Sequence, residues 1–348
     1  MTLVSIITPS YNQAAFLEQT IRSVLLQEGV EIEYCVVDGA STDSSIEIIQ
    51  RYAAQNVERS SLAVGYQGNV RRLSWWVSEP DRGQAEAINK GFRRTHGDIL
   101  AWLNSDDLYL PGAVQKAVTV LQANPELGLV YGDAITIDES GHPLNRLSFG
   151  DWNLSDLLAF RILCQPAVFM RRSVLEQAGY LDLSYHYMLD HHLWIRMGRL
   201  APIEHIQEIL AVARQHAGAK NVKQAAGFSI ETQRCLEWIQ TQPDLAEILQ
   251  NERRRILGGA YRLEARYYLD GGEPRTALNY YAKSLWYSPR YAWKHWHRMV
   301  YAIFSILGEK KLADRFLLPA SAQRKQQTVP AELKKLGDWP GLNLEGLA

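Results

Sequence analysis

The sequence has few cysteines and no long hydrophobic run, and these two absences exclude several classes of protein. The three cysteines, Cys35, Cys164 and Cys235, are odd in number, widely separated and free of CxxC spacing. This distribution argues against a disulfide framework and against a zinc site, and it favours a reducing compartment. The most apolar segment, residues 299–307, is about half as long as a membrane-spanning helix, which needs about 18 residues, so we expect no such helix.

An excess of charge of one sign is also absent. Lys and Arg number 37 and Asp and Glu 38, which gives a formal net charge of -1 and a pI near 6.8. This balance provides no general attraction to nucleic acid or acidic membranes, and we expect no nucleic acid partner. The first residues lack the basic stretch and cleavage site of a signal peptide, which favours a cytoplasmic protein. Neither GxGxxG nor a P-loop motif occurs, which excludes the usual dinucleotide and P-loop sites.

Strand and helix patterns alternate through the first 131 residues. Short apolar runs rich in β-forming residues predict strands at 4–8, 32–38, 73–78, 99–103 and 129–131. Between them, apolar residues recur at helical spacing. Such βα units predict an α/β, Rossmann-like fold with a mainly parallel sheet flanked by helices.

The pattern changes beyond residue 131, and three regions are expected. A hairpin around 139–141, a strand near 167–170 and a helix over 190–198 complete an α/β domain at 1–217, with halves 1–131 and 132–217. A helical C-terminal region follows at 218–318 and a polar tail at 319–348. More than one region is expected because single cores stop growing at about 250 to 300 residues.

Polar residues follow four of the predicted strands. Parallel sheets bind ligands beyond the carboxyl ends of their strands, so these residues are the first candidates for a ligand site. They are Thr8, Pro9, Ser10, Tyr11 and Asn12 after the first strand, Asp38 and Gly39 after the second, Asp81, Arg82 and Gly83 after the third, and Asn104, Ser105, Asp106 and Asp107 after the fourth. The helix after Gly83 adds Asn89 and Lys90. Four strand ends with carboxylates or amides predict a polar ligand at this edge.

The adjacent carboxylates of Asp106 and Asp107 suit a hard divalent cation. Magnesium or manganese is commonly held by one or two carboxylates and by substrate phosphates. Helix capping is the alternative interpretation for an isolated pair of aspartates. His216 follows a second strand-like run, residues 209–213, and is interpreted as a further residue at the metal or, alternatively, as a surface histidine.

Three further residues have a functional and a structural interpretation. Asp38 lies beside a glycine that permits close approach of a ligand, but it is also suited to building a turn. Arg82 precedes a helix N-terminus that would bind an anion, or it is an ordinary surface charge. Asp190 begins a helix and is suited to taking a proton from a hydroxyl group, or it stabilises the helix N-terminus.

Together these residues resemble the family 2 glycosyltransferases, which have the GT-A fold, and the likeness runs from Val4 to about His216. In that family the segments matching residues 8–12 and 38–39 contact the base and ribose, and the aspartate matching Asp81 helps to bind the donor. The resemblance implies that Asp106 is a direct metal ligand, that Asp190 is the catalytic base, and that His216 lies near the metal and the diphosphate.

The resemblance implies an inverting, hexosyltransferase-like enzyme that uses Mn²⁺ or Mg²⁺. It would move a sugar from a UDP-, GDP- or dTDP-linked donor to a saccharide or lipid-linked acceptor by direct displacement, in polysaccharide or glycolipid synthesis. Asn104 and Leu189 replace acids that are common in the family, which keeps a nucleotide-sugar-binding module without transfer activity as an alternative. A nucleotidyltransferase ranks last, because the sequence has no Gly-rich, Arg-containing N-terminal phosphate loop.

The helical region ends in a segment that mixes aromatic and basic residues. Helical patterns over 257–269, 274–287 and 291–307 resemble one tetratricopeptide-like pair followed by an amphipathic helix. The aromatic residues are Trp286, Tyr291, Trp293, Trp296 and Tyr301. Among basic neighbours they suit peripheral contact with a membrane near a lipid-linked acceptor. The alternative is that they dock the helices onto the catalytic domain.

Overall fold

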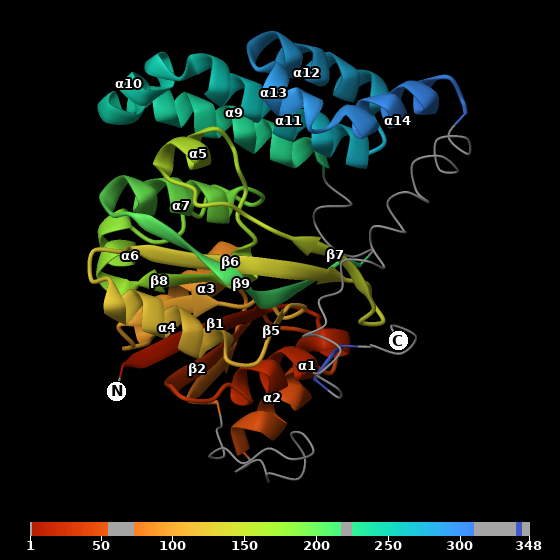
Figure 1. Ribbon diagram of the computed structural model, residues 1–348. Helices are drawn as coiled ribbons and strands as arrows, with labels where there is room; N and C mark the ends of the chain where they lie inside the picture. The colour runs from red at the N-terminus through yellow and green to blue at the C-terminus, as the bar shows by residue number, and fades with distance from the viewer. Residues whose placement is uncertain (1, 55–72, 217–224, 310–338, 343–348) are drawn as a thin grey trace.

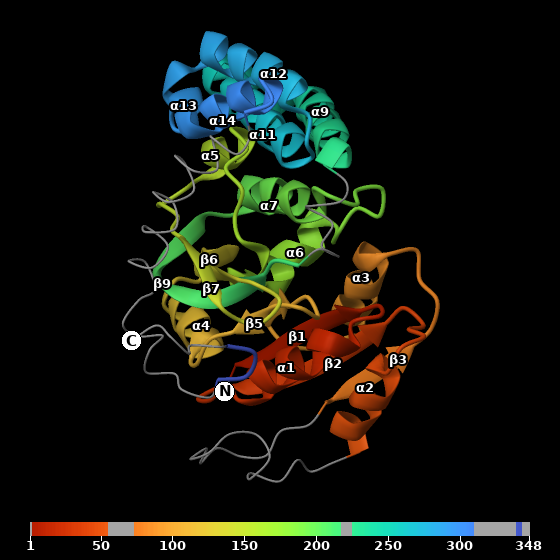
Figure 2. The same cartoon turned by 90° about the vertical axis from the view of Figure 1, so that its right-hand side faces the viewer.

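The computed structural model describes residues 2–54, 73–216, 225–309 and 339–342. Its centre is a nine-stranded sheet in the order β3-β2-β1-β4-β8-β6-β9-β5, with β7 paired to β6. A layer of C-terminal helices lies beyond α5 and α7 (Figures 1 and 2). The expected α/β fold with a helical C-terminal region is therefore confirmed. In the described part of the chain, every helix is too short or too polar to cross a bilayer.

The N-terminal half of the sheet is parallel, as the βα pattern predicts. Its strands are β1 (Leu3–Ser10), β2 (Glu31–Asp38), β3 (Trp75–Ser78) and β4 (Ile99–Trp102). Its helices are α1 (Ala14–Leu25), α2 (Ser45–Ala54) and α3 (Gln84–Arg94). Strand β1 pairs in parallel with β2 and β4, and β2 pairs in parallel with β3. The carboxyl ends of all four strands therefore meet at one edge.

The second half of the sheet makes it mixed. Its strands are β5 (Leu108–Tyr109), β6 (Leu129–Ile137), β7 (Pro143–Leu147), β8 (Val168–Arg171) and β9 (Ile203–Arg214). Its helices are α4 (Ala113–Ala123), α5 (Leu154–Leu158), η2 (Gln165–Ala167), α6 (Arg172–Ala178) and α7 (Leu189–Leu200). Strand β8 runs antiparallel to both β4 and β6, and β9 runs parallel to β6 but antiparallel to β5. The predicted hairpin at 139–141 joins β6 to β7.

Helices cover the sheet on two faces, so its central strands β1 and β4 are buried on both. Successive side chains of a strand point to opposite sides. Ile6 and Ala101 therefore join the hydrophobic cluster under α1 and α4, whereas Ile7 and Trp102 join the cluster under α3 and α7. The near-continuous apolar runs of β1 and β4 follow from this double burial.

The C-terminal helices share a core with the α/β domain. They are α9 (Ala225–Thr241), α10 (Pro243–Asn251), α11 (Arg253–Asp270), α12 (Pro274–Tyr287), α13 (Pro289–Trp293) and α14 (Trp296–Ile306). Ile239 of α9 and Tyr267 of α11 belong to the same hydrophobic cluster as Trp194 of α7. The boundary predicted at 218 lies outside the described residues, and so does most of the predicted tail. Within that tail, the Trp339 indole donates a hydrogen bond to the Tyr109 carbonyl, 2.9 Å away.

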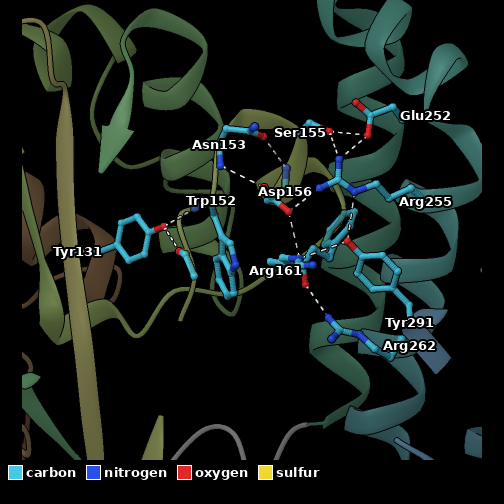
Figure 3. A network of polar contacts seen from close by, with 12 residues as sticks. Tyr131, Trp152, Asn153, Ser155, Asp156, Arg161, Glu252, Arg255, Arg262 and Tyr291 are labelled. Carbon is cyan, nitrogen blue, oxygen red and sulfur yellow. Dashed lines mark hydrogen bonds and ion pairs between the residues drawn. The ribbon is translucent and has the colours of Figure 1, made fainter. Parts of the chain in front are cut away.

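A polar network fixes α11 to α5 (Figure 3). Arg255 donates to Ser155 and pairs with Asp156, and Arg161 also pairs with Asp156. The Tyr291 hydroxyl accepts from both arginines at 3.2 Å. Tyr291 is thus a docking residue, which agrees with one of the two interpretations of the aromatic segment.

Candidate active site

Asp38 is the centre of the turn that follows β2. Its carboxylate is fully buried and accepts hydrogen bonds from the Ser41 amide at 2.8 Å, the Ser41 hydroxyl at 2.5 Å and the Ser78 hydroxyl at 2.7 Å. The two serines come from the ends of adjacent strands, so Asp38 ties the loop after β2 to the end of β3. These contacts favour the turn-building interpretation of Asp38, and they give the loop a fixed shape.

The loops after β1 and β2 are locked together by Asn12. The side-chain oxygen of Asn12 accepts a hydrogen bond from the Thr42 backbone amide at 2.8 Å, and the Asn12 backbone amide donates one to the Ser41 hydroxyl at 2.8 Å. Asn12 and Ala40 have φ angles of 52° and 61°, a region that residues other than glycine seldom adopt. Strained backbone of this kind persists where the surroundings hold it, and it is enriched at ligand sites.

Asp81 lies against the backbone of Gly39. A Cβ atom built on Gly39 would be 2.9 Å from an Asp81 carboxylate oxygen, so only glycine leaves room for that side chain. The other oxygen accepts from the Gly83 amide at 2.8 Å, at the start of α3. The neighbouring cations are paired: Arg82 forms an ion pair with Glu86 at 3.0 Å, and Lys90 forms one with Glu79 at 2.5 Å. Asp81 therefore faces the loop after β2 directly.

The contacts of Asp38 and Asp81 are the first part of a row along the strand ends. Asn104 and Asp107 continue this row toward β9. Asn104 accepts from Gln84 at 2.7 Å and donates to Asp107 at 3.1 Å. Asp107 is buried and accepts from the Arg214 amide at 3.0 Å. Burial and the charge of Asp106 raise the pKa of Asp107 well above its usual range. Both carboxylate oxygens of Asp107 are therefore hydrogen-bonded inside the protein. The side chain of Asp106 is more exposed than that of Asp107.

Asp106 and His216 face each other at the end of this row. The His216 Nε2 atom lies 3.0 Å from an Asp106 carboxylate oxygen, and this hydrogen bond raises the pKa of His216. Neighbouring ligands of an octahedral ion at about 2.1 Å also lie about 3.0 Å apart, so the pair suits a divalent cation as well as a hydrogen bond. The described residues contain no cluster of three or more potential ligand side chains.

Several predicted site residues point into the fold instead. The Thr8 hydroxyl contacts the buried Tyr34 hydroxyl at 3.0 Å, and Asn89 exchanges two hydrogen bonds with the Leu181 backbone. Pro9, Ser10 and Ser105 are buried as well. Tyr11 is different, because its ring is 62% exposed at the end of β1. It offers an aromatic face on which a base would stack.

Asp190 lies in the first turn of α7, a helix that packs against β4. It is one helical turn before Trp194, whose ring stacks on Trp102 of β4 at a centroid distance of 5.1 Å. Burial raises the pKa of Asp190 to about 6. A carboxyl group with this pKa is ionised at neutral pH and is basic enough to accept a proton. Burial, and after it the charges of Asp107 and Asp190, raise the pKa of Cys164, so this thiol lies near both carboxyl groups.

The site also depends on residues that the sequence interpretation did not assign. Ser78 and Gln84 each bond to a predicted site residue. The Arg214 side chain donates to the Asp106 carbonyl and to Gln19, and its guanidinium lies 4.8 Å from the Phe16 ring centroid. Arg214 ends β9, two residues before His216, and a polar residue at a strand end is a candidate for a ligand site. The sequence therefore contained an indication of its role. Nothing in the local sequence indicated Ser78 or Gln84.

The model of the family described as "Glycosyl transferase family 2" matches residues 5–179 of this chain. An uncharacterized glycosyltransferase from Nostoc sp. is 30% identical over 238 residues, which are 66% of this chain and 69% of that protein. The O-antigen biosynthesis protein RfbC of Myxococcus xanthus is 30% identical over 232 residues, which are 66% of this chain and 17% of that protein. An uncharacterized glycosyltransferase from Rickettsia conorii is 29% identical over 231 residues, 64% of this chain and 36% of that protein. The chain thus spans well under half the length of the last two relatives.

Solved structures share the fold at low sequence identity. The S. aureus TarS fragment 1–349 in complex with UDP is 14% identical, with a TM-score of 0.57 and coverage of 92% of both chains. The mannosyltransferase PcManGT from Pyrobaculum calidifontis, in complex with GDP-Man and Mn²⁺, is 19% identical, with a TM-score of 0.53. It matches 88% of this chain and 86% of its own. These likenesses extend through the C-terminal helices, because they cover more than the 217 residues predicted for the α/β domain.

Proposed function

The chain belongs to glycosyltransferase family 2, and from this premise we propose that it transfers a sugar from a nucleotide diphosphate donor to an acceptor hydroxyl group with inversion. The observation that carries the proposal is the row of contacts at the carboxyl ends of the strands, from Asp38 through Asp81 and Asn104 to Asp106 and His216, together with Asp190 on α7. With a divalent cation bound at Asp106 and His216, this row would suit an anionic donor, and Asp190 is suited to a hydroxyl acceptor.

In the proposed reaction, Asp190 acts as the general base. The acceptor oxygen attacks the anomeric carbon while the bond from that carbon to the diphosphate oxygen breaks. The acceptor proton passes to the Asp190 carboxylate, and the bonding electrons leave with the nucleoside diphosphate. Attack opposite the departing group inverts the anomeric carbon. A carboxyl pKa of about 6 leaves Asp190 ionised at pH 7 and allows it to take the proton as the new bond forms.

The donor is proposed to lie along the carboxyl ends of β1 to β4. Tyr11 offers a ring for the base, and the two loops containing Asn12 and Asp38 are held in one shape before the donor arrives. Binding to a preformed loop avoids the cost of ordering it. Asp106 and His216 are proposed to hold a divalent cation, Mn²⁺ or Mg²⁺, which when bound neutralises charge on the departing diphosphate. Polysaccharide or glycolipid synthesis is proposed as the setting, because the Myxococcus relative is named for O-antigen biosynthesis.

A module that binds nucleotide sugar without transferring it is the second candidate. It is motivated by Asn104, whose amide is engaged by Gln84 and Asp107, and by the apolar Leu189 before Asp190. Both candidates require donor binding, so turnover separates them. Release of nucleoside diphosphate that depends on an added acceptor would favour the enzyme, and donor binding without release would favour the module.

The donor site is tested by calorimetric titration with UDP, GDP and dTDP, each with Mn²⁺ and again with EDTA. We expect one nucleotide to bind, at least about tenfold more tightly with the metal, and we expect Asp106→Ala to lose that increment. Asp98→Ala is the matched control, because Asp98 is exposed and directly precedes β4, at the opposite end of that strand. If no nucleotide binds, or if both variants bind equally, the proposed donor site is wrong.

We also propose that the last helices contact an anionic membrane surface. Trp286, Trp293 and Trp296 are 80%, 70% and 51% exposed, and Ile303 and Leu307 continue the exposed apolar face along α14. Residues 274–308 contain five Lys and Arg and no Asp or Glu. Tryptophan beside cations is typical of segments that lie at a membrane interface.

Sedimentation with vesicles tests this contact. The protein should co-sediment with phosphatidylglycerol vesicles at low salt. Much less protein should co-sediment with phosphatidylcholine vesicles, because the attraction to the membrane is partly electrostatic. Replacing the three exposed tryptophans with alanine should abolish sedimentation. Ile230→Ala removes an exposed apolar side chain of α9 and should have no effect. Equal sedimentation of the tryptophan variant and the unmodified protein would refute the contact.

A further inference from the structure

Glu231 of α9 binds three consecutive backbone amides of the segment that leads into α7. One carboxylate oxygen accepts from His186 at 2.7 Å, and the other accepts from Tyr187 at 2.8 Å and Met188 at 2.7 Å. The Glu231 side chain is buried. Helix α7 begins at Leu189, so the carboxylate lies just before the turn that carries Asp190. Charge-assisted hydrogen bonds of this length are about twice as strong as neutral ones.

Other residues of α9 hold the same segment. Arg234 donates to the Ser184 carbonyl at 2.8 Å and to its hydroxyl at 2.6 Å, and its guanidinium lies 4.7 Å from the Tyr185 ring centroid. The Phe228 ring lies 5.1 Å from that of Tyr187. Each residue from 184 to 188 is therefore in contact with α9. The segment has no regular secondary structure of its own until α7 begins, so α9 fixes its path.

The α9 helix is itself fixed by α11. Glu264 accepts from the Ser229 hydroxyl at 2.8 Å and from Gln233 at 2.9 Å. The Tyr267 ring stacks on Phe228 at a centroid distance of 4.0 Å. Burial raises the pKa of Tyr267 to about 12, and the charge of Asp190 adds to this rise, so Tyr267 also lies near the proposed base.

We propose that Glu231 is a positioning residue for Asp190, and that the C-terminal helices are therefore part of the catalytic apparatus. The inference rests on the proposed function, in which Asp190 is the base. Through the three amides, Glu231 sets the place and direction of the first turn of α7. Misplacing a catalytic group by about 1 Å costs roughly a hundredfold in rate, so a rigid support has a direct effect on transfer.

Glu231 also acts on Asp190 through its charge. The charged and titratable groups that act on Asp190 are Glu231 from α9, Tyr267 from α11, Cys164 from the loop before η2, and the adjacent His191 of α7. Tyr267 and Cys164 are neutral at physiological pH because burial raises their pKa values, and His191 is neutral because burial lowers its pKa to about 4. Glu231 is consequently the charge in this set that disfavours ionisation of Asp190.

The test compares Glu231→Gln with the unmodified protein in the acceptor-dependent release of nucleoside diphosphate. Glutamine keeps the size of the side chain but places an NH₂ group where one oxygen accepts amide hydrogens. We expect kcat to fall by about ten- to a hundredfold, with donor Kd unchanged. We also expect the acid limb of the kcat–pH profile to move to lower pH, because one negative charge near Asp190 is lost. Glu237→Gln, at an exposed position of the same helix, should match the unmodified protein in every measurement.

Each outcome separates the inference from the proposed function. An unchanged kcat and pH profile in Glu231→Gln would overturn the positioning role while leaving the transferase intact. A parallel loss of donor affinity, kcat and melting temperature would show that Glu231 supports the fold in general, which also overturns it. Glu231→Asp keeps the charge and should restore the position of the acid limb even where kcat stays low. Absence of turnover in the unmodified protein would instead refute the proposed function.

Discussion

Trp194 stacks on Trp102 with an angle of 25° between the two rings. Trp102 is the last residue of β4, two residues before Asn104, and Trp194 is four residues after Asp190 on α7. One buried aromatic contact therefore sets the distance between the strand end that is proposed to bind the donor and the helix that carries the proposed base. The chemistry requires those two elements to be held together, and the stack does so without any polar group.

Replacing Asp190 with asparagine should remove transfer and leave donor binding nearly intact. Asparagine has a similar size but cannot accept the acceptor proton, so kcat should fall by about 10²- to 10⁴-fold, the usual range for loss of a general base. Calorimetry with the donor nucleotide and a turnover assay measure the two effects. Asp98→Asn is the control. A comparable loss of donor affinity would mean that Asp190 binds the donor.

The pH dependence of kcat should follow the ionisation of Asp190. Its pKa is about 6, and the base is active only when deprotonated. We therefore expect kcat to be constant at pH values above about 7 and to fall about tenfold per pH unit well below 6. A profile measured between pH 4.5 and 8.5, with the metal and both substrates saturating, gives the apparent pKa. An acid limb centred near 4 would indicate an unperturbed carboxyl group.

Asp190→Asn should also stabilise the fold, with a defined pH dependence. The pKa of Asp190 is about 6 in the folded chain and about 3.9 when unfolded, so ionising this side chain costs folding free energy. The cost is absent below about pH 4, grows as the pH rises from 4 to 6, and is constant above that range, where it amounts to about 1–3 kcal/mol. Thermal unfolding at pH 8 and at pH 4 measures it. The variant should melt higher at pH 8 only, and Asp98→Asn should show no such difference.

Gly39→Ala should weaken donor binding by at least about tenfold, or about 1.4 kcal/mol. The added methyl group would lie 2.9 Å from the Asp81 carboxylate, so that carboxylate or the loop after β2 must move. Titration with the donor nucleotide measures the change. Gly150→Ala is the control, because its nearest contact is the Trp152 indole nitrogen at 3.2 Å, away from the strand ends. Unchanged affinity would show that the Asp81 position does not matter for the donor.

The sequence predicted the α/β core correctly because its strands are buried on both faces. An apolar run such as the one that forms β1 is typical of a buried parallel strand. The polar residues that follow such strands lie together, because parallel strands end at the same edge of the sheet. The antiparallel half was less predictable. Strand β9 extends from Ile203 to Arg214, but residues 203–208 have an apolar residue only at every third position, and the prediction identified only the apolar run at 209–213.

Which site residues contact one another could not be predicted from local patterns. Asp106 and Asp107 are adjacent in sequence, yet one faces His216 and the other is buried against the Arg214 amide. That difference depends on where β9 lies, about a hundred residues later in the chain. Glu231 had no local indication either, because its role depends on the segment before α7. The proposed catalytic and metal-binding roles remain predictions until the variants are measured.

The contact between α11 and the end of α5 is a contact between two backbones. A Cβ atom at Gly259 would lie 2.0 Å from the Ala159 carbonyl oxygen, so the two backbones touch with no side chain between them. The same elements share one hydrophobic cluster around this contact. The C-terminal helices and the α/β domain are therefore packed as one unit here, and any side chain larger than that of glycine at position 259 would force the two backbones apart.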